Sequence, residues 1–225
     1  MPKTFEGILT MIENTKHKTL YIVGGVNGGG KSTFIKKFFT PQGINIIDVD
    51  SMAYQIGGDY SNSSNILASK KALEMLRDGP AAEQPLVWET VLSSSNCTRI
   101  INNFYRAGYQ IDLTYIFLED MATHLDRIEK RVSNGGHDIP KANVTKRFDN
   151  RKQNFEKIIS YAHNWRMFCN QSPWFELVAF GHFGNKIIGS QSLFDGFCNQ
   201  PPQQDKTYPD ETLCGFFALR NQKNK

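Results

Sequence analysis

The sequence predicts an α/β fold in which a mainly parallel sheet is flanked by helices on both faces, in three layers. Short runs of β-branched and aromatic residues alternate with segments of helical periodicity. A glycine-rich loop ending in Lys-Ser separates the first of these runs from the first helical segment. The 225 residues, 40% of them hydrophobic, suffice for one sizeable core, so we expect a single domain over residues 1–225.

The first half of the chain predicts three strands and two helices. The first run is β-branched and ends in two glycines, as in a buried parallel strand. Pro41 ends the first helix, and Gly79 followed by Pro80 ends the second. The second run carries acidic residues at its carboxyl end. In order, the expected elements are strand 19–23, helix 32–39, strand 44–50, helix 64–78 and strand 86–88.

The second half continues the alternation. Asn96 and Asp120 can cap helices, and Gly108 can end one. We expect a helix from Asn96 to Gly108, a strand over 111–118, a helix from Asp120 to about 132, a long helical pattern from 139 to about 163, and a strand over 174–180. The core would then span about 19–180. Residues 181–225 form an extension of unknown role, loosely ordered from 198 with one short element near Phe216.

The loop after the first strand matches the pattern G-x-x-x-x-G-K-S/T over residues 25–32. Glycines let successive backbone N–H groups point inward, and the following helix adds its positive end to this anion site. Lys31 would hold the β- and γ-phosphates, and the Ser32 hydroxyl would coordinate Mg²⁺. The loop therefore predicts a P-loop NTPase or kinase fold with ATP and Mg²⁺ as ligands. The expected ATP-binding residues are Gly25, Asn27, Gly28, Gly29, Gly30, Lys31, Ser32 and Thr33.

Other nucleotide-binding classes fit the sequence less well. A dinucleotide site requires G-x-G-x-x-G, but Thr33 stands where the last glycine belongs. A guanine-specific GTPase would carry N-K-x-D, and Asn185-Lys186 is followed by two isoleucines. The stretch 133–137 is not the signature of a transporter ATPase. A small kinase remains the best interpretation.

Acidic residues follow the second and third predicted strands. Asp48 and Asp50 close one strand, and alternation along an extended chain would place them on one side. Glu89 and Thr90 close the next. Because open α/β sheets bind ligands at the carboxyl ends of their strands, these side chains can converge near the γ-phosphate. One carboxylate would accept the proton of an attacking hydroxyl, and another would orient the acceptor or a metal-bound water.

Together these motifs resemble the zeta toxin family and its standalone relatives, which are P-loop kinases. The resemblance covers about residues 19–172. Its most specific part is the run from Arg127 to Pro140, and one departure is Cys169 where the relatives have Asp. The other matching segments are the loop 25–33, Ile47-Asp48-Val49-Asp50, Trp88-Glu89-Thr90, Arg106-Ala107-Gly108-Tyr109 and the strand end 168–172.

The resemblance implies ATP-dependent phosphorylation of the 3'-hydroxyl of the amino sugar in UDP-N-acetylglucosamine. Lys31 would stabilise the transferring phosphoryl group and Asp50 would be the general base. Glu89 and Thr90 would bind the acceptor, and Arg127 and Arg131 would be lid arginines. We add Asp48 to the expected acceptor-binding residues because of its place at the strand end. An antitoxin, as a separate chain, is a possible partner. Three further basic residues are weaker candidates for phosphate contact: His137, Arg147 and Arg151.

Two other functions remain open. The chain could phosphorylate another small alcohol or a nucleoside, or it could be an ATP-regulated binding module or a nucleic-acid-associated ATPase. Residues 121–160 contain nine basic and five acidic residues, whereas residues 41–120 contain five basic and ten acidic ones. The basic stretch holds only Phe148 and Phe155 for stacking on bases, which makes nucleic acid an improbable partner.

The remaining composition fits an ordinary globular protein. The four cysteines form no C-x-x-C pair, so we expect structural thiols rather than a metal site. The N-terminus lacks the pattern of a secretory signal, and no apolar stretch is long enough to span a bilayer. A cytoplasmic protein without a membrane segment is therefore the expectation.

Overall fold

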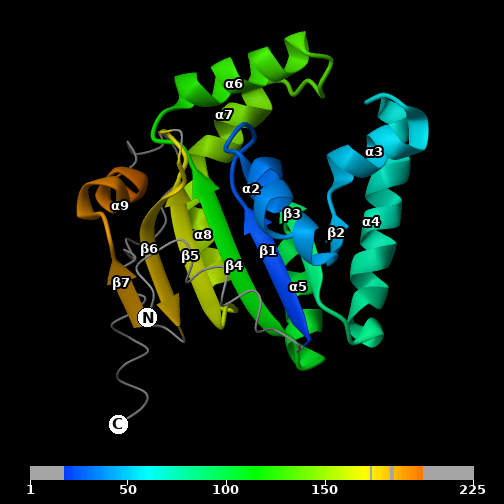
Figure 1. Ribbon diagram of the computed structural model, residues 1–225, viewed down its shortest axis with the longest axis horizontal. Helices are drawn as coiled ribbons and strands as arrows, with labels where there is room; N and C mark the ends of the chain where they lie inside the picture. The colour runs from blue at the N-terminus through cyan, green and yellow to red at the C-terminus, as the bar shows by residue number, and fades with distance from the viewer. Residues whose placement is uncertain (1–17, 173, 183–184, 200–225) are drawn as a thin grey trace.

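The computed structural model describes residues 18–172, 174–182 and 185–199, and within them a seven-stranded sheet forms the centre of the molecule (Figure 1). The strand order is β2-β3-β1-β4-β5-β6-β7. The first five strands in this order are parallel to one another. At the other edge, β6 is antiparallel to β5, and β7 is antiparallel to β6. The strands are β1 Thr19–Gly24, β2 Asn45–Ile47, β3 Leu86–Thr90, β4 Gln110–Phe117, β5 Asn164–Cys169, β6 Glu176–His182 and β7 Asn185–Ile188.

Helices cover both faces of this sheet, which confirms the predicted three-layer α/β architecture. Along β1, Leu20 and Ile22 join a core with residues of α4, α5 and α8, whereas Tyr21 and Val23 pack with α2 on the other face. The helices are α2 Lys31–Phe38, α3 Val49–Gly57, α4 Asn62–Ala82, α5 Asn96–Arg106, α6 Met121–Ser133, α7 Lys141–Asp149, α8 Arg151–Ile159 and α9 Gln191–Cys198, with a 3₁₀ turn at Thr40–Gln42.

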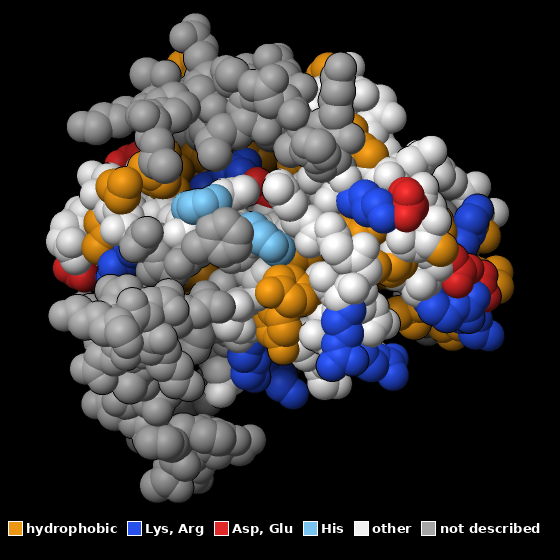
Figure 2. Space-filling model, turned by 90° about the horizontal axis from the view of Figure 1, so that it is seen from below, with side chains coloured by type: hydrophobic (Ala, Val, Ile, Leu, Met, Phe, Trp, Pro, Cys, Tyr) orange, Lys and Arg blue, Asp and Glu red, His pale blue; other side chains and the backbone are white. Residues whose placement is uncertain are grey.

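The two ends of the sheet differ in what covers them. α6 and α7 lie across the carboxyl ends of the parallel strands, above the loop between β1 and α2 (Figure 1). The described part of the opposite end, seen from below, presents dispersed Lys and Arg side chains, some of them beside acidic ones, among hydrophobic and other uncharged surface (Figure 2). A third hydrophobic cluster, formed by Val26, Ile128, Ile139 and Val144, attaches α6 and α7 to the phosphate loop. The fold therefore concentrates its candidate chemistry at the end that α6 and α7 cover.

The prediction of strand 44–50 was wrong at its carboxyl end. β2 stops at Ile47, and α3 begins at Val49. The carboxylate of Asp48 accepts hydrogen bonds from the N–H groups of Asp50, at 3.1 Å, and Ser51, at 3.4 Å, so it is the N-cap of α3. Asp50 consequently lies in the first turn of a helix and does not share a strand face with Asp48.

The long helix predicted up to residue 163 was also wrong. It is divided at Asn150 into α7 and α8, and β5 follows from Asn164. Within β5, Arg166 is buried and pairs with Asp112 of β4 at 2.6 Å, which lets a charged residue occupy an interior strand. The sequence pattern predicted no strand over residues 164–169 because Arg166 interrupts the run of apolar residues.

The expected strand 174–180 begins at Glu176, and β7 and α9 occupy part of the extension to which we assigned no role. The element expected near Phe216 lies outside the described residues. Of the cysteines, Cys97 and Cys169 are buried thiols and Cys198 is half-buried, all without disulfides. In the described part of the chain, no helix combines the length and the apolar character needed to cross a membrane.

Candidate functional site

The phosphate loop joins β1 to α2 in a conformation that only glycine adopts without strain. Gly25 has φ +142° and Gly30 has φ +101°. A Cβ on Gly25 would lie 2.0 Å from the carbonyl oxygen of Ile116, and one on Gly30 would lie 2.2 Å from the amide nitrogen of Asn170. The glycines of the motif therefore serve the close packing of the loop against β4 and the end of β5.

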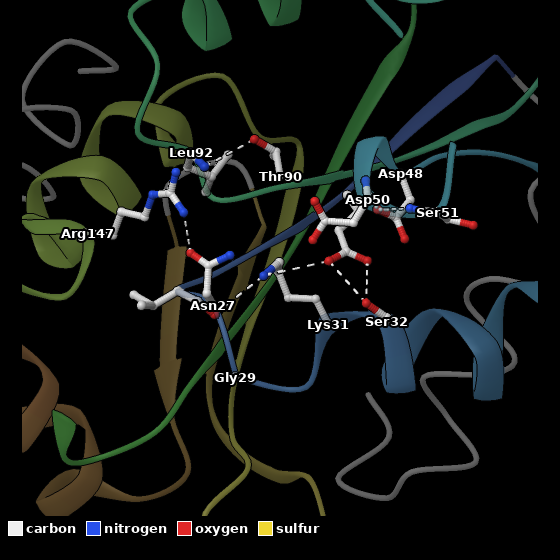
Figure 3. Close-up of polar contacts among 12 residues, drawn as sticks. Asn27, Gly29, Lys31, Ser32, Asp48, Asp50, Ser51, Thr90, Leu92 and Arg147 are labelled. Atoms are coloured by element: carbon white, nitrogen blue, oxygen red, sulfur yellow. Dashed lines mark hydrogen bonds and ion pairs between the residues drawn. The ribbon is translucent and has the colours of Figure 1, made fainter. Parts of the chain in front are cut away.

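Three side chains from distant segments hold this loop. His124 Nδ1 donates to the carbonyl oxygen of Asn27 at 2.6 Å, and Asn170 Nδ2 donates to the carbonyl oxygen of Gly29 at 2.9 Å. Arg147 Nη1 donates to the side-chain oxygen of Asn27 at 2.6 Å (Figure 3). The loop is thus fixed from α6, α7 and the end of β5.

His124 is fully buried, and burial lowers its pKa to about 4. The nearby charges of Lys31, Arg151 and Arg127 lower the pKa further, and the hydrogen bond to Asn27 opposes them. The ring is therefore neutral near pH 7. Because the carbonyl oxygen of Asn27 can only accept, the proton sits on Nδ1.

Lys31 and Ser32 meet Glu89 from the end of β3. Lys31 Nζ lies 3.7 Å from Glu89 Oε1 and 3.4 Å from the carbonyl oxygen of Val26. The Ser32 hydroxyl donates to Glu89 Oε2 at 3.0 Å (Figure 3). The two loop residues with side-chain chemistry therefore both face one carboxylate, which the parallel register of β1 and β3 brings beside the loop.

The carboxylates at this end of the sheet influence one another. Burial and the charge of Asp50 raise the pKa of Asp48, while hydrogen bonds from the start of α3 and Lys31 lower it. Burial also raises the pKa of Glu89, with the charges of Asp48 and Asp50 adding to this and Lys31 and Ser32 opposing it. A cluster of this kind gains from a cation, because each carboxylate costs less to ionise once positive charge is near.

A cavity of about 730 Å³ opens beside the loop and collects most of the predicted site. The charged or ionisable part of its lining includes Lys31, Asp48, Asp50, Glu89, His137, Asp138 and Arg147, with Asn27 and Thr90 beside them. Between α4 and α5 the described lining is uncharged, with amide and hydroxyl groups from Asn62, Asn65, Ser69, Ser94 and Asn96. The cavity is thus ionic at the phosphate loop and neutral toward the two helices.

The predicted lid arginines lie elsewhere. Arg127 Nη2 donates to the carbonyl oxygen of Asn170 at 2.7 Å, and Arg131 Nη2 donates to that of His137 at 2.5 Å. Neither belongs to the described cavity lining. Arg151 is buried, stacks on Phe148 with its guanidinium carbon 3.8 Å from the ring centroid, and is also outside the cavity. Of the arginines that we considered, Arg147 lines the cavity.

The surroundings of Ser32 bear on the predicted Mg²⁺ site. The Ser32 hydroxyl donates to Glu89 at 3.0 Å, and hydroxyl and carboxylate oxygens are the kind of ligand that a hard divalent cation prefers. Among the described residues, no group of three or more His, Cys, Asp and Glu side chains could hold a metal by itself.

His124 and Asn170 were not predicted as site residues. His124 contacts Asn27 across 97 positions, and Asn170 contacts Gly29 across 141. Neither position carries a local motif, because the contact depends on which strands become neighbours. For Asn170, the only available signal was its place in the strand end that resembles the zeta-like relatives.

The family model described as AAA domain, AAA_33, matches residues 20–158, more than half of the chain, so the chain belongs to this family. A relative from Haemophilus influenzae (strain ATCC 51907 / DSM 11121 / KW20 / Rd), known only as an uncharacterized protein, is 30% identical over 125 residues. The match covers 55% of this chain and 88% of the relative.

Solved structures share the fold. The crystal structure of AvrRxo1-ORF1:AvrRxo1-ORF2 with sulphate ions matches with a TM-score of 0.65 and 19% identity, over 89% of this chain and 73% of that chain. The same complex with ATP matches with a TM-score of 0.65 and 18% identity, over 90% and 73%. A structure of the PezAT toxin-antitoxin system of Streptococcus pneumoniae matches with a TM-score of 0.58 and 17% identity, over 97% and 92%. The chain therefore has a P-loop kinase-like fold.

Proposed function

We propose that the protein is an ATP-dependent kinase that transfers the γ-phosphoryl group to a hydroxyl of a small molecule. The observation that carries the proposal is the single cavity in which the phosphate loop, through Lys31, meets the carboxylates of Asp50 and Glu89. Phosphoryl transfer requires little more than positioning, charge stabilisation and a group that receives the proton of the acceptor. A structural neighbour that contains ATP is consistent with the nucleotide.

In this mechanism the backbone N–H groups of the loop and Lys31 bind the β- and γ-phosphates. Ser32, supported by Glu89, would hold Mg²⁺, which supplies positive charge against the phosphate oxygens. Glu89 contacts both loop side chains, so we assign to it the orientation of the loop in addition to contact with the acceptor. These interactions hold the phosphoryl group without acting on the acceptor hydroxyl.

Asp50 is the proposed general base. Its carboxylate lines the cavity from the first turn of α3, and Asp48 caps the same helix. As the bond from the acceptor oxygen to phosphorus forms and the bond to the ADP oxygen breaks, Asp50 accepts the hydroxyl proton. Asp48 and Thr90 line the same cavity and would contact the acceptor.

For the acceptor, we propose UDP-N-acetylglucosamine, the substrate that the resemblance to zeta toxins implies. The uncharged lining between α4 and α5 offers amides and hydroxyls suited to a sugar or nucleoside. The same lining supports the alternative, a kinase of another small alcohol or nucleoside. Only the first acceptor produces phosphorylated UDP-N-acetylglucosamine.

A screen of ATP consumption over UDP-sugars, free sugars and nucleosides tests the function, with the Lys31→Ala variant as the blank. Product from UDP-N-acetylglucosamine would be identified by phosphorus NMR and mass spectrometry. Acceptor-dependent ADP release by the native protein, absent from Lys31→Ala, supports a kinase. ATP turnover that no acceptor changes but that increases with DNA or RNA would overturn the kinase proposal.

An antitoxin encoded as a separate chain is the proposed partner. The structural neighbours AvrRxo1-ORF1:ORF2 and PezAT are both two-component assemblies, and PezAT is called a toxin-antitoxin system. If this chain is likewise toxic, expression of the native protein should stop the growth of a bacterial host, whereas Lys31→Ala should not. Equal growth of the two strains would count against this proposal.

A further inference from the structure

Arg147 reaches the phosphate loop with its charge uncompensated. Its guanidinium donates to the neutral side-chain oxygen of Asn27 at 2.6 Å, and within the described chain no carboxylate lies within ion-pair distance of it. Asp50 is near enough to act on it electrostatically. An arginine held by an amide oxygen keeps its full positive charge, together with most of its five N–H donors, for an anion.

Asn27 is in turn fixed on both sides. Its carbonyl oxygen accepts from His124 of α6, at 2.6 Å, and its side-chain oxygen accepts from Arg147 of α7. Asn27 is only 7% exposed, and both it and Arg147 line the cavity that contains Lys31 (Figure 3). The loop residue therefore fixes where the guanidinium of α7 stands relative to the phosphate loop.

We propose that Arg147 is the arginine that contacts the transferring phosphoryl group and that Asn27 is its positioning residue. This inference rests on the proposed kinase function. The competing cations are engaged outside the cavity: Arg127 and Arg131 bind backbone oxygens of residues 170 and 137, and Arg151 stacks on Phe148. Arg147 therefore supplies the charge that stabilises the phosphoryl oxygens, which are most electron-rich in the transition state.

The test compares a ground-state and a transition-state ligand without needing the acceptor. Isothermal titration calorimetry in the presence of Mg²⁺ gives the Kd of a non-hydrolysable ATP analogue and of ADP with aluminium fluoride. We expect Arg147→Ala to weaken the aluminium fluoride complex by about 100-fold while the ATP analogue changes by about threefold or less. Lys146→Ala, which removes an exposed charge from the same helix, is the matched control and should leave both Kd values unchanged.

Asn27→Ala should weaken the aluminium fluoride complex by about tenfold, because Arg147 is still present but is no longer held in position by the side chain of residue 27. In the double variant, loss of Asn27 should add nothing to loss of Arg147, which is the coupling expected of a residue that acts through another. Additive losses would assign Asn27 to the loop alone and overturn its positioning role. Arg147→Lys retains the charge, so an intermediate Kd separates loss of a contact from failure to fold.

The two levels of the hypothesis fail differently. If no acceptor releases ADP from the native protein in the screen, the kinase proposal and this inference are both wrong, whereas if the native protein binds ADP no more tightly with aluminium fluoride than without it, this inference alone is wrong. If the native protein shows the enhancement and Arg147→Ala keeps it, the inference alone is wrong. The same holds if Arg127→Ala or Arg131→Ala abolishes the enhancement while Arg147→Ala does not.

Discussion

Asp50 stands in the first turn of α3 and lines the cavity, and it takes part in the helix cap through its backbone N–H, which a change of side chain leaves in place. Replacement by Asn retains size and removes the ability to accept a proton. We expect Asp50→Asn to lower kcat with the accepted substrate by about 10²- to 10⁴-fold, with the Kd for ATP nearly unchanged. Steady-state kinetics and calorimetry measure the two quantities.

Asp126→Asn, on the exposed side of α6, is the control for this Asp-to-Asn change. Its carboxylate pairs with Lys130 at the surface, and such a pair contributes little. It should therefore retain native kcat. Retention of native kcat by Asp50→Asn would exclude Asp50 as the base and direct attention to Asp48, the other carboxylate at the start of α3.

Gly30 is one of the positions at which the loop does not tolerate a side chain. A methyl group there would meet the Asn170 amide at 2.2 Å in a backbone with φ +101°. We expect Gly30→Ala to weaken ATP binding by at least about tenfold, because Asn170 or the loop must move. Gly43→Ala, with φ +67° and no atom within 4 Å, shares the strained backbone without the clash, so it should bind ATP like the native protein.

At the scale of elements, side-chain caps determine where helices begin. Asp120 Oδ1 accepts from the N–H of Thr123 at 2.7 Å, and the other oxygen accepts from the hydroxyl of Thr123 and the amide of Gln171. These hydrogen bonds lower the pKa of Asp120, so its stabilisation is present above the ordinary Asp pKa and is lost as the pH falls.

Loss of this cap should destabilise the protein measurably. We expect Asp120→Ala to reduce the free energy of unfolding by about 1 kcal/mol at pH 7, and Asp120→Asn, which can still cap, to lose less. Urea unfolding of the two variants at equal protein concentration measures the difference. Equal losses would mean that the charge rather than the cap geometry is what stabilises α6.

Asp120, which was predicted as a cap, does cap α6, whereas Asn96, also predicted as a cap, is the first residue of α5 and follows the N-cap Ser95. Asp48 was missed because the apolar run before it reads as a strand through Val49 and Asp50, whereas the cap hydrogen bonds turn the chain at residue 48. β5 was missed because Arg166 looks like a surface residue until Asp112 of the neighbouring strand is known. The error at β5 came from a partner distant in the sequence, and the error at Asp48 came from a local cap that the apolar run concealed.

Across the whole molecule, the parallel centre of the sheet and the position of the phosphate loop followed from alternation and one motif. The carboxylates of Asp48, Asp50 and Glu89 were predicted to be near the loop, because parallel strands place their ends together, and they line one cavity. The arrangement of α6 and α7 over the loop was not predictable. It depends on contacts such as His124 with Asn27, whose geometry requires the assembled fold.

That long-range contact makes the stability of the whole protein depend on pH. The folded pKa of His124, about 4, lies below the ordinary value of 6.5, so the unfolded chain takes up a proton first as the pH falls. The stabilisation is complete above pH 6.5 and is lost toward pH 4. As the pH falls from 7 to 4.5, protonation of this imidazole in the unfolded chain should lower the unfolding free energy by about 2 to 3 kcal/mol.

The raised pKa values of Asp48 and Glu89 act in the opposite direction, since the folded protein retains their protons better than the unfolded chain does. Comparison with His124→Gln isolates the ring, because the variant has the same carboxylates but no titrating imidazole. Its unfolding free energy, from urea denaturation, should be lower than native at pH 7 and should fall less between pH 7 and pH 4.5. Parallel loss in the two proteins would mean that the buried ring is not what makes the molecule sensitive to acid.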